Sequence, residues 1–281
     1  MKSFLGAKDY FEKSEIVIIG VPFDATSSFR AGSRFAPDSI RFYSESIETY
    51  SPYFDYDIEE INFYDYGNIE VTISNFFQLR KALKEKVKFF LKKGKKVLSI
   101  GGEHLITLPI IEAYHEFYND LKIIQLDAHL DLRDTYLNEK YSHATVMRRI
   151  SEIISVKNIF QFGIRSGTKE EFLFANRNTN FFPFSLPDLN NFLDKFLKTN
   201  IYLTLDLDVF DPGVMPGTGN PEPGGIGFND FMKFLNELTK VNANIVGVDV
   251  VELSPEYDKS GNSSVFAAKV IRELLVILKN L

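Results

Sequence analysis

The chain has 281 residues, of which 44% are hydrophobic and 25% are charged, and its formal net charge is −6. These values are typical of a folded globular protein and argue against a largely disordered chain. The acidic balance disfavours a nucleic-acid partner, because proteins that bind duplexes usually carry a basic surface. Cysteine is absent, which excludes disulfides, thiolate catalysis and thiolate metal sites.

The N-terminal region lacks the apolar segment of a secretory signal, and no apolar run approaches the ~20 residues that span a membrane. We therefore expect a cytoplasmic protein with no membrane partner. The length fits one large α/β domain as well as two small ones. Because no low-complexity linker or internal repeat is visible, we expect a single domain over residues 1–281. The Pro- and Gly-rich segment 211–227 is interpreted as a structured loop over a site.

Short apolar runs rich in β-branched residues alternate with helical patterns along the chain. Such runs are typical of strands in a parallel sheet that is buried on both faces. In chain order, the predicted elements are a strand at 16–20, a helix at 76–90, strands at 97–100, 123–126, 159–164 and 201–207, a helix after Asn229, a strand at 245–251 and a helix at 266–278. The alternation predicts an α/β fold with right-handed crossovers.

The helix at 76–90 carries the clearest start and stop signals. Its apolar residues recur at three- and four-residue spacing. Ser74 or Asn75 is expected to cap its beginning, and Gly94 is expected to end it.

Acidic residues and histidines follow four of the predicted strands, where ligands bind in parallel α/β sheets. The sequences at these strand ends are GGEH with His104, DAHLD with Asp127, His129 and Asp131, DLD with Asp206 and Asp208, and a last strand that reaches Glu252. Residues two apart in an extended backbone face the same side. If the backbone stays extended past the strand ends, four aspartates and two histidines gather in one place.

Four clustered carboxylates repel one another and take up protons unless cations balance them. Two divalent cations would match four aspartates, and oxygen ligands with some imidazole suit manganese or a similar first-row metal. A pair of such ions can activate a water molecule for attack. Taken singly, each aspartate could instead be an ordinary turn or cap residue. The coincidence of all these residues at strand ends favours the metal site.

Two further residues have candidate catalytic roles. His143 could move protons beside the metal site, or it could simply begin a helix next to a capping Ser142. Glu252 could hold a cationic group opposite the metals, or it could be a surface carboxylate at a strand end. His115 lies in a helical stretch and is expected to be unrelated to the site.

The motifs GGEH at Gly101, DAHLD at Asp127, SHAT at Ser142 and DLDVFDPGVMPGTGNPEPGG from Asp206 resemble those of the ureohydrolase (arginase/agmatinase) family, in its agmatinase-like branch. The resemblance covers essentially the whole chain. It implies a three-layer α/β/α fold around a mainly parallel sheet, two Mn²⁺ per chain, and a homotrimer or homohexamer. The residues that match metal-ligand positions are His104, Asp127, His129, Asp131, Asp206 and Asp208. His143 matches the proton-shuttling histidine, and Glu252 matches the glutamate that orients the guanidinium.

The resemblance also implies hydrolysis of a small cationic guanidino compound to urea and an amine. The loop PGTGNPEPGG is more similar to agmatinases than to arginases. The separate segment Gly163-Ile164-Arg165-Ser166 lacks the acidic residue that follows the corresponding motif in arginases. Agmatine or a close polyamine analogue is therefore the expected substrate. Arg133 leaves guanidinobutyrate open, and arginine and aminopropylagmatine are further alternatives. A zinc-dependent deacetylase-like amidohydrolase and a non-catalytic metal-binding relative are alternatives of other classes.

Overall fold

The computed structural model describes residues 2–70 and 75–279. Within these residues, eight strands form one sheet in the order β4-β1-β5-β10-β9-β6-β7-β8. Every pair of neighbours in this sheet is parallel. The strands are β1 (Ile16–Val21), β4 (Phe63–Asn68), β5 (Lys96–Gly101), β6 (Lys122–Leu126), β7 (Ile159–Ile164), β8 (Asn180–Pro183), β9 (Asn200–Asp206) and β10 (Asn244–Val251).

All six predicted strands are present, and no strand end differs from the prediction by more than one residue. The sequence analysis missed β4 and β8, which form the two edges of the sheet, and a small antiparallel pair, β2 (Tyr50–Ser51) with β3 (Tyr56–Asp57). The edge strands mix polar and apolar residues and are only partly buried. They therefore lack the continuous apolar run that identifies a central strand.

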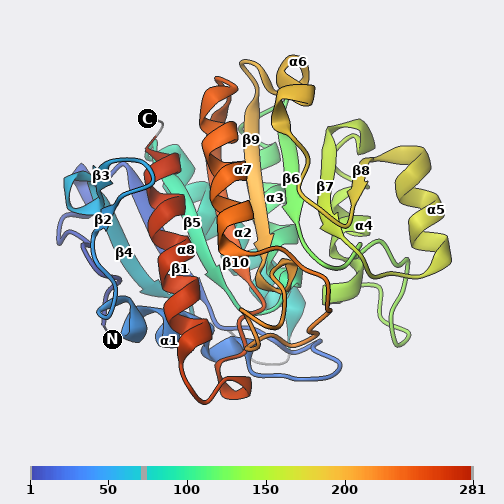
Figure 1. Cartoon of the computed structure of the whole chain (residues 1–281), viewed down its shortest axis with the longest axis horizontal. Helices are drawn as coiled ribbons and strands as arrows, with labels where there is room; N and C mark the ends of the chain where they lie inside the picture. Colours follow the sequence, from blue (N-terminus) through green and yellow to red (C-terminus); the bar gives the residue numbers. More distant parts are fainter. Residues whose placement is uncertain (1, 71–74, 280–281) are drawn as a thin grey trace.

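Helices cover both faces of the sheet (Figure 1). They are α1 (Ala36–Ser44), α2 (Phe76–Lys92), α3 (Thr107–His115), α4 (Val146–Ile150), α5 (Lys169–Asn178), α6 (Leu193–Phe196), α7 (Phe228–Lys240) and α8 (Asn262–Leu278). The apolar residues of α1, α7 and α8 belong to one core cluster, and those of α2, α3 and α4 belong to the other. The three-layer α/β/α architecture is thus as the sequence predicts.

The side chains of β1 show how the sheet separates the two clusters. Ile16 and Ile18 pack into the cluster under α1 and α8, whereas Val17 and Ile19 pack into the cluster under α2 and α3. All four side chains are buried. A strand buried on both faces favours apolar residues on both sides, which explains the uninterrupted apolar sequence from Ile16 to Ile19.

The predicted signals of α2 are found in the structure. The Asn75 side chain accepts a hydrogen bond from the Gln78 backbone N–H, so Asn75 is the N-cap. Gly94 follows the helix with φ of 71°, a left-handed conformation that favours glycine. Ser74, the other cap considered, lies outside the described residues.

No helix in the described part of the chain is long and apolar enough to cross a membrane.

The four central strands of the sheet, β5, β10, β9 and β6, are direct neighbours. Because they are parallel, their carboxyl ends lie side by side at the same end of the sheet. These are the four strands after which the sequence places its histidines and acidic residues, so the topology alone brings those segments together.

Candidate active site

The first group of candidate metal ligands surrounds His104, which begins the 3-10 turn His104–Ile106 after β5. Its Nδ1 atom lies 3.0 Å from Asp131 Oδ2, 3.1 Å from Asp127 Oδ2 and 3.5 Å from Asp206 Oδ2. These four side chains are buried. Asp127 and Asp131 follow β6, and Asp206 ends β9, so three strands contribute to this group.

The second group surrounds His129. Its Nδ1 atom lies 2.9 Å from Asp208 Oδ2 and 3.8 Å from Asp127 Oδ1, and its side chain is 26% exposed. Potential ligand atoms of His104, Asp127 and Asp206 lie within 4.8 Å of one another, as do those of Asp127, His129 and Asp208. The two groups share Asp127, whose two carboxylate oxygens face different histidines. One carboxylate is therefore placed to serve two neighbouring ions.

The electrostatics of these carboxylates show why they need cations. Burial, followed by the charges of Asp131 and Asp208, raises the pKa of Asp127 to about 7. Burial and the charges of Asp208 and Asp127 also raise the pKa of Asp206 well above its usual value. Burial acts in the same direction on Asp208, but the charge and hydrogen bond of His129 outweigh it and lower the pKa to about 2. Each carboxylate is thus ionised only as far as a neighbouring positive charge allows.

The donor set fits a divalent cation. His104 Nδ1 is buried among three carboxylates, yet it has no hydrogen-bond partner among the described residues. A buried nitrogen without a partner is costly unless a ligand satisfies it. Carboxylate oxygens and imidazole nitrogens are ligands that manganese and similar first-row ions accept.

The backbone differs from the extended path that the sequence analysis assumed. β9 ends at Asp206, and Asp208 lies in the 3-10 turn Leu207–Val209, where its N–H donates to Asp206 Oδ1 over 2.9 Å. Asp131 has a left-handed φ of 54°. The condition of an extended backbone is therefore not met, because turns and not strand periodicity direct these side chains. The residues gather nonetheless.

Gly102 brings the loop after β1 against the loop after β5. A Cβ atom on Gly102 would lie 1.9 Å from the carbonyl oxygen of Phe23, so only glycine fits. The neighbouring Glu103 N–H donates to the same carbonyl over 2.7 Å. The backbones of the two loops therefore approach each other closely at Gly102.

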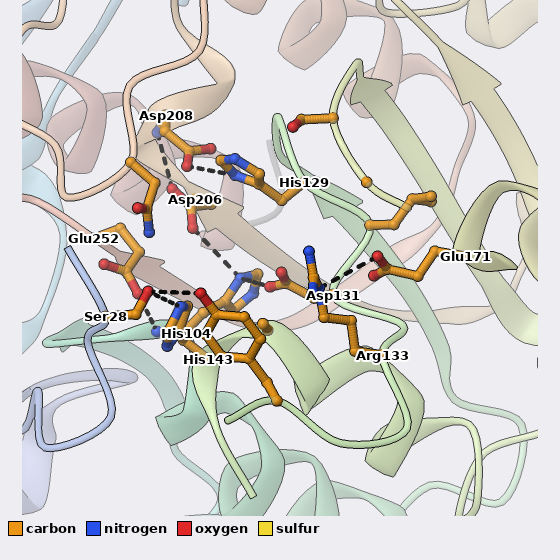
Figure 2. Close-up of a pocket in the computed structure, with 16 residues that line it drawn as sticks. Ser28, His104, His129, Asp131, Arg133, His143, Glu171, Asp206, Asp208 and Glu252 are labelled. Atoms are coloured by element: carbon orange, nitrogen blue, oxygen red, sulfur yellow. Dashed lines mark hydrogen bonds and ion pairs between the residues drawn. The ribbon is translucent and has the colours of Figure 1, made fainter. Parts of the chain in front are cut away.

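Glu252 follows β10 and lines the same pocket as the two histidines (Figure 2). Its backbone is left-handed, with φ of 66°, and its Oε1 accepts a hydrogen bond of 2.7 Å from the His104 N–H. Burial, followed by the charge of Glu103, raises its pKa well above the usual range. Holding a carboxylate in strained backbone and low dielectric is unfavourable, which is typical of a functional site.

His143 begins the 3-10 turn His143–Thr145 and also lines the pocket. Its N–H donates to Thr26 Oγ1 over 3.0 Å, and its Nε2 lies 3.4 Å from Ser28 Oγ. Burial lowers its pKa, which favours the neutral ring. His115 is half-buried at the end of α3 and does not line this pocket.

The pocket also contains residues that the sequence analysis missed or left unassigned. Arg133 lies with its Nε 3.5 Å from Glu171 Oε2 and its guanidinium over the ring of Tyr136. The Tyr136 hydroxyl donates to Ser28 Oγ over 3.2 Å. Arg133 and Tyr136 lie on the segment after β6, Ser28 lies on the segment after β1, and Glu171 lies in the first turn of α5. A position shortly after a strand was the signal that could have found Ser28, whereas Glu171 carried no such signal.

The Pro- and Gly-rich segment 211–227 is a structured loop, as expected, and its Asn220 lines the pocket. The Asp211 carboxylate accepts hydrogen bonds from the backbone of Gly213, Gly224 and Gly225. Arg165 donates to the Asp208 and Glu222 carbonyls and so joins this loop to the second group of candidate ligands.

Fold and pocket together define an α/β protein with a candidate carboxylate–imidazole metal site and a further carboxylate facing the same cavity. Comparison with known proteins identifies the family. The model of the arginase family matches residues 14–277. The chain therefore belongs to the arginase family and is a ureohydrolase, an enzyme that hydrolyses a guanidino C–N bond.

Individual relatives span nearly the whole chain. An agmatinase of Bacillus anthracis is 42% identical over 277 residues, which cover 98% of this chain and 96% of that protein. The N(1)-aminopropylagmatine ureohydrolase of Thermococcus kodakarensis is 37% identical over 266 residues, with coverages of 92% and 89%. The structure of a candidate agmatinase from Clostridium difficile superposes with a TM-score of 0.93 at 46% identity, covering 96% of this chain and 98% of that one.

Proposed function

We propose that this ureohydrolase is a binuclear manganese enzyme that converts agmatine, or a close polyamine analogue, to urea and an amine such as putrescine. The observation that carries the proposal is the position of Glu252, a buried carboxylate that faces the same pocket as two metal-binding groups sharing Asp127. A guanidinium needs both a nucleophile at its carbon and an anion at its nitrogens. This pocket has residues for each.

The residues proposed to hold the two ions are His104, Asp127 and Asp206, with Asp131 beside them, for one, and Asp127, His129 and Asp208 for the other. When bound, two Mn²⁺ ions would supply Lewis acidity that makes a water molecule nucleophilic near neutral pH. The first proposed ion position lies deeper in the protein than the second, since His104 is buried whereas His129 is partly exposed.

Glu252 is proposed to orient the substrate. A planar guanidinium matches a carboxylate through two parallel N–H donors, which fixes the plane of the cation as well as its position. The hydrogen bond from the His104 N–H holds Glu252 in one orientation relative to the metal-binding groups. Such alignment lowers the entropic cost of attack on the guanidinium carbon.

His143 is proposed to transfer the proton that the departing amine needs. Burial lowers its pKa and so favours the neutral ring, which can accept a proton from the attacking water and deliver it to the leaving nitrogen. The contacts with Thr26 and Ser28 hold the ring at the pocket.

The proposed preference for a cationic substrate rests on the environment of Arg133. Its ion pair with Glu171 offsets its charge, so the pocket does not present a free cation to an acidic substrate. The other charged side chains lining the pocket are carboxylates and histidines. This environment favours agmatine over guanidinobutyrate.

A screen of urea release tests the proposal. The purified enzyme with Mn²⁺ should release urea from agmatine or aminopropylagmatine with a higher kcat/KM than from arginine or guanidinobutyrate. Metal analysis should give two manganese ions per chain. One zinc ion per chain with no urea from any of the four compounds would favour the deacetylase-like alternative, and metal binding without hydrolysis would favour a non-catalytic relative.

We also propose a cytoplasmic location and, from the family resemblance, a homotrimeric or homohexameric state. Light scattering of the purified protein tests the second of these, and a monomer would contradict it.

A further inference from the structure

A chain of buried polar side chains leads away from the metal-binding groups into the sheet. Its members are His104, Thr204 on β9 and Asp249 on β10, all of them 0–1% exposed. His104 Nε2 lies 2.9 Å from Thr204 Oγ1, and Thr204 Oγ1 donates to Asp249 Oδ1 over 2.7 Å. Thr204 and Asp249 are direct partners in the register of the two parallel strands, so the sheet itself fixes their contact.

The direction of these hydrogen bonds determines the tautomer of His104. A threonine hydroxyl has one proton, and here that proton points to Asp249. Thr204 Oγ1 can therefore only accept from His104, which requires the proton of the neutral ring to be on Nε2. Nδ1 is then left with a lone pair, and this is the atom that faces Asp127, Asp131 and Asp206.

A lone pair directed at carboxylates is repulsive unless a cation lies between them. The arrangement around Nδ1 is thus suited to a metal ion, since this atom has no hydrogen-bond partner among the described residues. Histidines that bind metals commonly donate their other ring N–H to a carboxylate or carbonyl, which fixes the ring and raises the basicity of the ligand nitrogen. Here a threonine is interposed between the ring and the carboxylate.

Asp249 needs an explanation of its own, because burying a carboxylate inside a sheet is costly. Its second oxygen, Oδ2, accepts a hydrogen bond of 2.8 Å from the Tyr202 hydroxyl. Tyr202 therefore satisfies the same carboxylate but lies outside the path from Asp249 to His104. Asp249 therefore accepts one hydrogen bond on the path to His104, from Thr204, and one of similar length outside that path, from Tyr202.

We propose that Thr204 and Asp249 are positioning residues that hold His104 with Nδ1 free for metal and strengthen this ligand. This inference rests on the proposed metal site of the ureohydrolase, and it concerns the affinity of one of the two ions. Loss of this hydrogen-bonded path should weaken the binding of the ion at His104 and leave the binding of the ion at His129 largely unchanged.

The experiment measures Mn²⁺ binding directly, by calorimetric titration of metal-stripped protein in the absence of substrate. Thr204→Val and Asp249→Asn should each weaken one of the two Mn²⁺ sites by about 10–100-fold. Tyr202→Phe is the matched control and should change both affinities by less than about threefold. Thr204→Ser keeps the hydroxyl and should restore the affinity that Thr204→Val loses.

The outcomes separate the inference from the proposed function. If the unsubstituted protein binds two Mn²⁺ and Thr204→Val binds them as Tyr202→Phe does, the positioning role is wrong while the metal site stands. If the unsubstituted protein binds no Mn²⁺, both fail. If Thr204→Val does not fold, the comparison of Asp249→Asn with Thr204→Ser still tests the proposal. Asp249→Asn should bind one Mn²⁺ more weakly than Thr204→Ser does, and equal Mn²⁺ affinities in these two variants would overturn the proposal.

Discussion

The two ends of the central strands differ in what they bury. At the carboxyl ends of β5, β10, β9 and β6, the carboxylates of Asp127, Asp206, Asp208 and Glu252 are nearly inaccessible to water. At the amino ends, polar groups are paired and closer to the surface: Asn200 donates to Asp120 over 2.8 Å, and Lys96 donates to the Leu278 carbonyl over 2.7 Å. The sheet therefore concentrates uncompensated charge at one end, where a cation and a substrate can compensate it.

The largest effect is expected from replacing Asp127, the carboxylate shared by the two candidate metal-binding groups at the carboxyl ends of the strands. Asp127→Asn should lower kcat by at least about 10³-fold and reduce the manganese content below two ions per chain, because both metal-binding groups lose a carboxylate. Steady-state kinetics and elemental analysis measure these effects. Asp134→Asn is a matched control, since the Asp134 side chain is 77% exposed and pairs with Arg149. Full activity of Asp127→Asn would contradict the shared position.

The next largest effect concerns Glu252, the carboxylate in the same pocket as the candidate metal-binding groups. Glu252→Gln keeps an oxygen that can accept from the His104 N–H but loses the charge that would pair with a guanidinium. Two charge-assisted hydrogen bonds are worth roughly 1.5–3 kcal/mol each, so kcat/KM for agmatine should fall by about 100-fold or more. Manganese content should not change. A parallel loss of metal would show that Glu252 supports the metal site instead of the substrate.

A smaller effect tests the ion pair at the pocket. Glu171→Gln leaves the charge of Arg133 uncompensated and should raise KM for agmatine by about tenfold. Arg133→Gln removes the positive charge and should leave KM for agmatine unchanged or lower, while raising it for guanidinobutyrate. Kinetics with both substrates measure the effect. Equal responses of the two variants would show that the pair acts only on the structure.

The smallest effect lies at the amino end and concerns stability. Burial lowers the pKa of Lys96 to about 8, from 10.5 for the ordinary side chain. Between these values the unfolded chain binds more protons than the folded one, so this residue makes the protein more stable as pH rises. The penalty is complete below about pH 8 and fades towards pH 10.5.

Lys96→Met removes that penalty at every pH. The stability of the variant relative to the unsubstituted protein should therefore be greatest below pH 8 and decline as pH rises, measured as the difference in urea unfolding midpoints of the metal-free proteins. A difference that stays constant from pH 7 to pH 10 would show that Lys96 is not desolvated.

The sequence predicts the inner strands because burial on both faces leaves a clear apolar run, as in Ile16 to Val21. It does not predict β4 or β8, since an edge strand has one neighbour and tolerates polar residues. The gathering of His104, Asp127 and Asp206 also follows from the sequence, because the carboxyl ends of parallel strands lie at the same end of the sheet.

Contacts between loops could not be predicted in the same way. The pairing of Arg133 with Glu171, and of Thr26 with His143, depends on how segments distant in sequence fold over the strand ends. The left-handed backbone of Asp131 likewise depends on its tertiary surroundings. No local pattern in one sequence records these contacts.

The contact between Gly102 and Phe23 has a consequence for variation of this enzyme. Any side chain at position 102 would push the Phe23 carbonyl away, and with it the segment whose Thr26 is held by Glu103 and in turn holds His143. Gly102 offers no side chain to metal or substrate, yet a random-mutagenesis library selected for urea release should retain glycine there as strictly as it retains Asp127. Sequence tolerance in this enzyme is therefore governed by how closely two loops approach as well as by the chemistry of the pocket.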